Sequence, residues 1–132
     1  MLSIFPELLV YTLAAPLILR LAAGTLFLMW GVGCFTSSKQ VLRARLEEWN
    51  LPGKETVFIL GILELAVGAL LLLGLYTQVA AILGAALAAK FAFLSRKETF
   101  GSASTTVYIL VALISLSLAL TGPGFFAFDL PL

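Results

Sequence analysis

Residues 59–73 read ILGILELAVGALLLL, and this stretch decides the fold. Its one ionisable side chain is Glu64, and the sequence has no other between Thr56 and Leu75. A charge at the centre of a membrane-spanning helix costs roughly 2.5–3.5 kcal/mol on insertion scales, so this carboxylate should face a bundle interior and find a partner. The other hydrophobic stretches offer one equally central charge, Arg20. We therefore expect an Arg20–Glu64 pair between the first two spanning helices.

The composition is that of a membrane protein. The 132 residues are 61% hydrophobic and 11% charged, with a mean hydropathy of +1.11. Soluble domains carry about a quarter charged residues, so we expect lipid to cover the excess apolar surface. A net charge of +1 argues against nucleic acid as a partner. The chain has no His and one Cys, Cys34, so we expect no metal site, no His-ligated haem and no intramolecular disulfide.

Four hydrophobic stretches predict the architecture. We expect an all-α membrane protein, a four-transmembrane-helix bundle that forms a single domain over residues 1–132. Small residues recur at helical spacing within the stretches, which lets neighbouring helices approach closely. The expected spans are residues 11–34, 55–75, 78–94 and 106–121.

The segment between the first two spans, residues 38–50, is amphipathic. Helical spacing places Leu42, Leu46 and Trp49 on one face, with charged side chains around the rest. This pattern predicts a short interfacial helix lying on the membrane surface, and a solvated connector is the alternative. We regard Arg43, Arg45 and Trp49 as candidate contacts for a protein partner.

The distribution of Lys and Arg predicts the orientation. These residues gather in the loops 36–54 and 95–105, whereas the Tyr76 turn and the two termini have none. The positive-inside rule therefore places both loops in the cytoplasm and both termini outside, with the cell (inner) membrane as the expected location. The first basic side chain, Arg20, already lies inside a hydrophobic stretch, so we expect no cleaved secretory signal.

The expected polar centre has two interpretations. Arg20 and Glu64 either fix which helix faces meet or line a pocket that binds a polar headgroup, a quinone carbonyl or a proton in transit. Tyr108 and Ser115 share a face of the fourth span and would join this centre. Cys34 is interpreted as a packing residue, because no second Cys or His stands by to activate it.

Four stretches in this order and spacing resemble the DoxX family of small four-helix membrane proteins. The resemblance covers Leu17 to Asp129, and the family is similar in carrying Arg20 and Glu64. Many members have a Lys at the position that looks like Cys34 here, so a site that uses this Lys is not carried over. The matching stretches are LRLAAGTLFLMWG (19–31), LPG (51–53), GILELAVGALLLLGLYTQVAA (61–81) and GPGFFAFD (122–129).

The resemblance implies a redox setting, because relatives are associated with quinone-linked membrane oxidoreductases, including thiosulfate:quinone oxidoreductase, and with complexes that handle thiol or oxidative stress. The leading hypothesis is a small subunit or anchor of a membrane redox complex, which contacts quinone or lipid at the polar centre and recruits a protein partner through residues 36–56. The alternatives are a stand-alone quinone-binding enzyme or proton-coupled transporter, and a purely structural accessory subunit. Without His and with one Cys, the chain is not expected to transfer electrons alone.

Overall fold

The computed structural model describes residues 14–36, 39–48, 52–94, 104–122 and 124, and these residues are almost entirely helical. The ends of the helices lie within three residues of the predicted ones wherever the description reaches. Pro16 falls in the first turn of the first helix, where its missing N–H needs no partner. The helices are α1 (Ala14–Phe35), α2 (Lys39–Glu48), α3 (Gly53–Leu73), α4 (Thr77–Leu94) and α5 (Thr105–Thr121).

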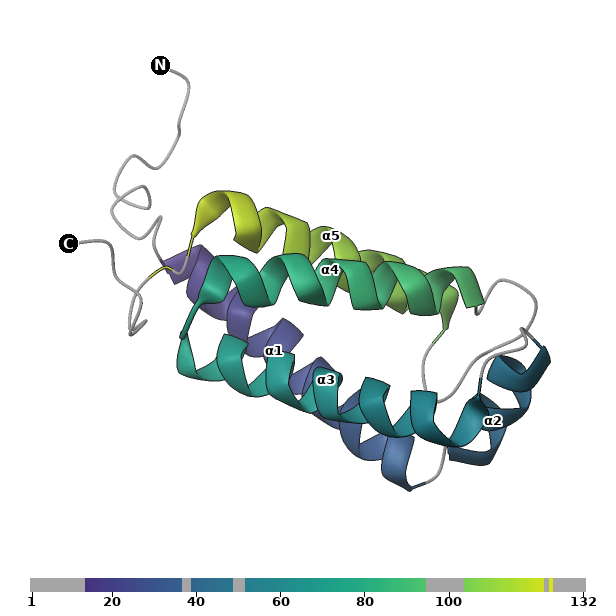
Figure 1. Ribbon diagram of the computed structural model, residues 1–132. Helices are drawn as coiled ribbons and strands as arrows, with labels where there is room; N and C mark the ends of the chain where they lie inside the picture. The colour runs from purple at the N-terminus through teal and green to yellow at the C-terminus, as the bar shows by residue number, and fades with distance from the viewer. Residues whose placement is uncertain (1–13, 37–38, 49–51, 95–103, 123, 125–132) are drawn as a thin grey trace, which may run out of the picture.

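The four long helices form two antiparallel pairs. Figure 1 shows α1 beside α3 and α4 beside α5, with the short α2 at one end of the bundle. The two pairs meet where the fully buried ring of Phe27 lies against Gly84 of α4; a Cβ atom built at Gly84 would come within 3.0 Å of that ring. Small residues on α4 make room there, since Ala80, Ala81 and Ala88 are fully buried.

Glycines bring α1 and α3 into direct backbone contact. A Cβ atom at Gly24 would lie 3.1 Å from the Gly68 carbonyl oxygen, and one at Gly31 would lie 3.0 Å from the Leu65 nitrogen. Further along, a Cβ atom at Gly61 would meet the side chains of Cys34 and Phe35. These contacts fix the register of the pair, because an antiparallel helix that slipped by one residue would drive side chains into the facing backbone.

The turn between α3 and α4 is as tight as the sequence indicates. Gly74 ends α3 with φ of 69°, and its N–H bonds the carbonyl groups of Leu70 and Leu71. Tyr76 also has a positive φ, 47°, which few non-glycine residues adopt. The chain thus reverses direction over three residues and starts α4 at Thr77.

Lengths and surfaces fit an all-α fold of membrane type. α1 and α3 are predominantly apolar helices of 22 and 21 residues, and at 1.5 Å per residue they span about 33 and 32 Å, enough to cross a hydrocarbon core of about 30 Å. α4 and α5 are apolar but shorter, with 18 and 17 residues, so crossing by all four helices stays a prediction. The outward faces carry large exposed apolar side chains, among them Ile18, Met29, Ile82, Leu113 and Leu120.

α2 packs its apolar side against the rest of the protein. Leu42 and Leu46 are 3% and 1% exposed, and Gly53 of α3 packs against the Arg43 carbonyl oxygen and the Glu47 side chain. The apolar face of α2 therefore packs against protein at these two leucines, and the placement of α2 on the membrane surface stays a prediction. Periodicity identifies the apolar face of a helix but not what covers it. Trp49 lies outside the described residues.

We expect Gly68→Ala to destabilise the α1–α3 pair. The new Cβ atom would lie 2.9 Å from both the Gly24 carbonyl oxygen and the Leu28 nitrogen, and neither backbone atom can rotate away. Overpacking of this kind costs about 1–3 kcal/mol. Thermal unfolding in detergent, followed by circular dichroism, measures the loss. Ala69→Leu adds more volume at an exposed neighbour and serves as the control; equal melting of Gly68→Ala and wild type would contradict the close contact.

We expect Leu46→Ala to release α2 from the bundle. Truncating a buried leucine costs about 2–5 kcal/mol, a large share of what holds a ten-residue helix in place. Hydrogen exchange of the α2 amides, read by mass spectrometry, should become faster while exchange in α3 stays slow. Gln40→Ala changes an exposed position of the same helix and should leave exchange unaltered. Unchanged exchange in Leu46→Ala would mean that the bundle does not hold this face.

Candidate functional site

Glu64 is buried in the bundle, and its partner is Cys34. The Cys34 thiol of α1 donates a hydrogen bond to Oε2 of Glu64 on α3, with a sulfur–oxygen distance of 3.4 Å. The exposed fractions are 3% for Cys34 and 1% for Glu64. A thiol is a weak donor, so this bond satisfies the carboxyl group only in part. The Glu64 carboxyl group therefore keeps capacity to accept further hydrogen bonds.

The register of α1 and α3 creates this pair. Gly31 faces Leu65 and Gly61 faces Cys34, so the thiol and the carboxyl group meet between two glycine contacts. Since both glycines lack side chains, the helices approach closely enough for two short polar groups to touch. The structure thus confirms that Glu64 faces the bundle interior.

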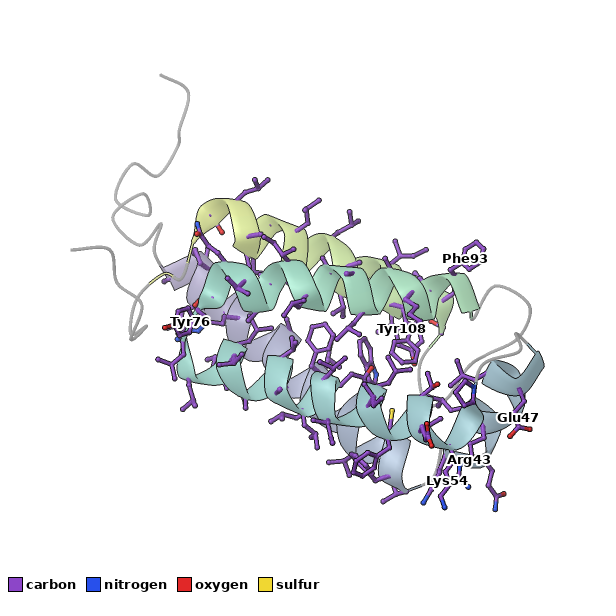
Figure 2. The ribbon with its side chains drawn as sticks, in the orientation of Figure 1. Arg43, Glu47, Lys54, Tyr76, Phe93 and Tyr108 are labelled. Carbon is purple, nitrogen blue, oxygen red and sulfur yellow. The ribbon has the colours of Figure 1, made fainter. Side chains whose placement is uncertain are left out.

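Aromatic rings form the wall beside the pair. The Trp30 and Tyr108 ring centroids lie 4.5 Å apart, and the Phe91 ring stacks on Tyr108 at 5.6 Å. Phe27 meets Trp30 edge to face at 5.6 Å. Trp30 lies one turn before Cys34 on α1, so its contact places the Tyr108 ring near the Cys34–Glu64 pair. Figure 2 shows Tyr108 between the two helix pairs.

Arg20 lies at a different level along the helix pair from Glu64, so the register of α1 and α3 does not support the expected direct Arg20–Glu64 pair. Arg20 is buried, at 2% exposed, but it comes one turn before Gly24, which faces Gly68. Arg20 therefore lies level with Leu72, eight residues beyond Glu64, or about 12 Å along the helix axis. A direct ion pair needs an N–O distance within about 4 Å.

Ser115 belongs to the level of Arg20. Trp30 faces Tyr108 across the antiparallel α1 and α5, so Ser115, seven residues on, faces Ala23. Thr77 reaches the same level, because α4 runs parallel to α1 and Gly84 faces Phe27. The Ser115 and Thr77 hydroxyls are fully buried and have no hydrogen-bond partner among the described residues. The four predicted site residues thus divide into two layers, Glu64 with Tyr108 and Arg20 with Ser115.

A pocket of about 490 Å³ leads to Cys34 from the α2 end of the bundle. Its lining is partly apolar and partly charged. This pocket includes Arg43, one of the predicted partner contacts, whereas nothing is described for the side chain of Arg45. The apolar lining residues are Cys34, Phe35, Val57, Phe58 and Ile59, and the charged ones, which we call the rim, are Lys39, Arg43, Lys54 and Glu55.

Sequence reasoning missed Cys34 as a functional candidate. A signal was present: Cys34 shares a helical stripe with Gly24 and Gly31, and Glu64 shares one with Gly61 and Gly68. Stripes with matching glycines belong to one interface, which makes their polar members neighbours. Within the described ranges, no three side chains of His, Cys, Asp or Glu gather as metal ligands.

Comparisons with known proteins identify the family. The DoxX family model matches residues 15–96, well over half of the chain, and this stretch contains α1 to α4, Cys34 and Glu64. No curated protein and no solved structure matched the chain. The match agrees with the resemblance noted in the sequence and with the apolar helices of the fold. The chain belongs to the DoxX family and is a helical membrane protein that sits in a lipid bilayer.

Proposed function

We propose that this protein is a small inner-membrane subunit of a quinone-linked redox complex, and that quinone meets it at the Cys34–Glu64 pair. The observation that carries the proposal is the double role of Cys34. Its thiol donates a hydrogen bond to the buried Glu64 carboxyl group, and the same residue lines the 490 Å³ pocket. A headgroup in the pocket would therefore touch a polar group connected to a proton-holding carboxyl.

The chemistry of a quinone fits this arrangement. Its two carbonyl oxygens accept hydrogen bonds, and reduction to the quinol takes up two electrons and two protons. The Cys34 thiol has one proton, so it would turn from Glu64 to donate to a quinone carbonyl oxygen, while a protonated Glu64 behind it donates to the sulfur. The apolar side chains of Val57 and Phe58 suit the ring, while Ile59, 56% exposed, leaves a lateral way out for an isoprenoid tail.

The electrons must come from another chain. A sequence without His and with one Cys supplies no ligand set for haem or an iron–sulfur cluster. We place the protein partner at the α2 end, where Arg43 and Lys54 project (Figure 2). If all four long helices cross the membrane, the positive-inside rule turns this end to the cytoplasm and both termini outward.

The polar centre that we propose differs from the one expected from sequence. The Arg20–Ser115 layer becomes a structural level of the bundle, and the Cys34–Glu64 layer becomes the ligand contact. A stand-alone enzyme or transporter would have the same pocket but would need no partner. Purification of the tagged chain from its native membranes in mild detergent, with mass spectrometry of bound proteins and small molecules, separates these functions. Quinone without a stoichiometric protein partner would overturn the subunit assignment.

We expect Glu64→Gln to weaken quinone binding by about tenfold to a hundredfold. A hydrogen bond that involves a charged group contributes about 1.5–3 kcal/mol, and each 1.4 kcal/mol is a factor of ten. Titration of the purified protein with a short-tailed quinone, followed by quenching of tryptophan fluorescence, measures the affinity. A photoreactive quinone should label the peptide that contains Cys34 in wild type.

Glu47→Gln is the matched control, because Glu47 is an exposed acid of α2 outside the pocket lining. Cys34→Ala tests the thiol separately, and circular dichroism checks that each variant is folded. If folded Glu64→Gln and Cys34→Ala bind quinone as wild type does, the ligand does not contact this pair and the proposed site is wrong.

A further inference from the structure

The charged rim of the pocket has a ligand chemistry of its own. We propose that Lys39, Arg43 and Lys54 bind the phosphate of an anionic phospholipid, whose acyl chains run along the adjacent face of α3. This site shares the pocket and the Phe58–Ile59 surface with the proposed quinone contact, but its ligand is recognised by the charged rim, and it does not depend on the redox function. The proposal rests on the charge of the rim, on the buried Nε atom of Arg43 and on the apolar surface beside it.

The rim contains three cationic side chains and one acidic side chain. Lys39 and Arg43 come from α2 and Lys54 from the start of α3, and Glu55 is the acid among the pocket-lining residues. Two consecutive helices, α2 and α3, thus both contribute positively charged residues to the lining of one cavity. A phosphate group is the common membrane ligand that fits such a cluster, because Arg and Lys both bind phosphate oxygens through charge-assisted hydrogen bonds.

The Arg43 side chain lines the pocket and has one buried hydrogen-bond donor. Its Nε atom is buried and has no hydrogen-bond partner among the described residues. Since buried polar atoms are almost always bonded, an unpartnered donor at a cavity indicates a missing acceptor. The docking of α2 holds this donor in place, because the Arg43 carbonyl oxygen packs on Gly53.

The surface beside the rim fits acyl chains. Phe58 and Ile59 line the pocket and are each 56% exposed on the outer face of α3. The rim itself lies where α1 ends at Phe35 and α3 begins at Gly53, which is the level of the headgroups if these helices cross the bilayer. A soluble anion would use the cations but leave this apolar strip without a role. Charge and apolar surface together therefore favour a phospholipid.

The test is lipid binding by the full chain in detergent, measured by native mass spectrometry. Phosphatidylglycerol and phosphatidylcholine with identical acyl chains are added at equal concentration. We expect preferential retention of phosphatidylglycerol. Removing one rim charge, in Lys39→Gln, Arg43→Gln or Lys54→Gln, should weaken its binding about fivefold, the value of one cation near an anionic headgroup.

Lys90→Gln is the matched control. Lys90 is an exposed cation near the α2-side end of α4, so the variant loses the same charge on the same side of the bundle but outside the pocket. An equal loss in Lys90→Gln and Lys54→Gln would reduce the effect to bulk charge and overturn the site. Equal retention of the two lipids would overturn it as well, and so would tight binding of inorganic phosphate alone, which would identify a soluble anion as the ligand. Loss of quinone binding with lipid binding intact would affect only the proposed redox function.

Discussion

The backbone contact between α1 and α3 is the constraint on which the rest of the structure depends. Three glycines at this interface, Gly24, Gly31 and Gly68, leave no space for a side chain between the helices. In a membrane, apolar side chains gain little by leaving lipid for another helix, so close packing and polar contacts supply the specificity. The register set by the glycines decides which polar side chains meet, and it selects Cys34 as the partner of Glu64.

The helices and their buried faces could be predicted from the sequence, because they depend on local patterns. A long apolar run, a glycine with a left-handed backbone at Gly74 and glycines beside Glu64 each act within one or two turns. The depth of one helix relative to another is not local. The predicted Arg20–Glu64 pair requires the two side chains to lie at equal depth, but α1 continues to Phe35 before the chain turns. That extension moves Arg20 away from Glu64 by more than one helical turn.

The same reasoning explains which parts of the site were found. Glu64 and Tyr108 were identified because a central charge and a buried hydroxyl are visible in a helical wheel. Cys34 is a packing residue on sequence grounds because no second Cys or His is present, and its contact with the Glu64 carboxyl group depends on the register of two helices, which the sequence of one helix does not show. The pocket could not be predicted at all, since it exists only because α2 folds back onto the start of α3.

The two polar layers lie at different levels of the bundle. Arg20, Thr77 and Ser115 lie near the Tyr76 end, far from the described pocket, and three of the four long helices contribute to that level. The Thr77 and Ser115 hydroxyls have no hydrogen-bond partner among the described residues, so this layer holds small buried side chains where the helix pairs meet and not a closed polar network. Cys34 and Glu64 lie toward the α2 end and connect to a cavity. Among the described residues, the Glu64 carboxyl group accepts its hydrogen bond from the Cys34 thiol, and Cys34, not Glu64, lines the pocket, so a ligand at the proposed site would reach the carboxyl group through the thiol.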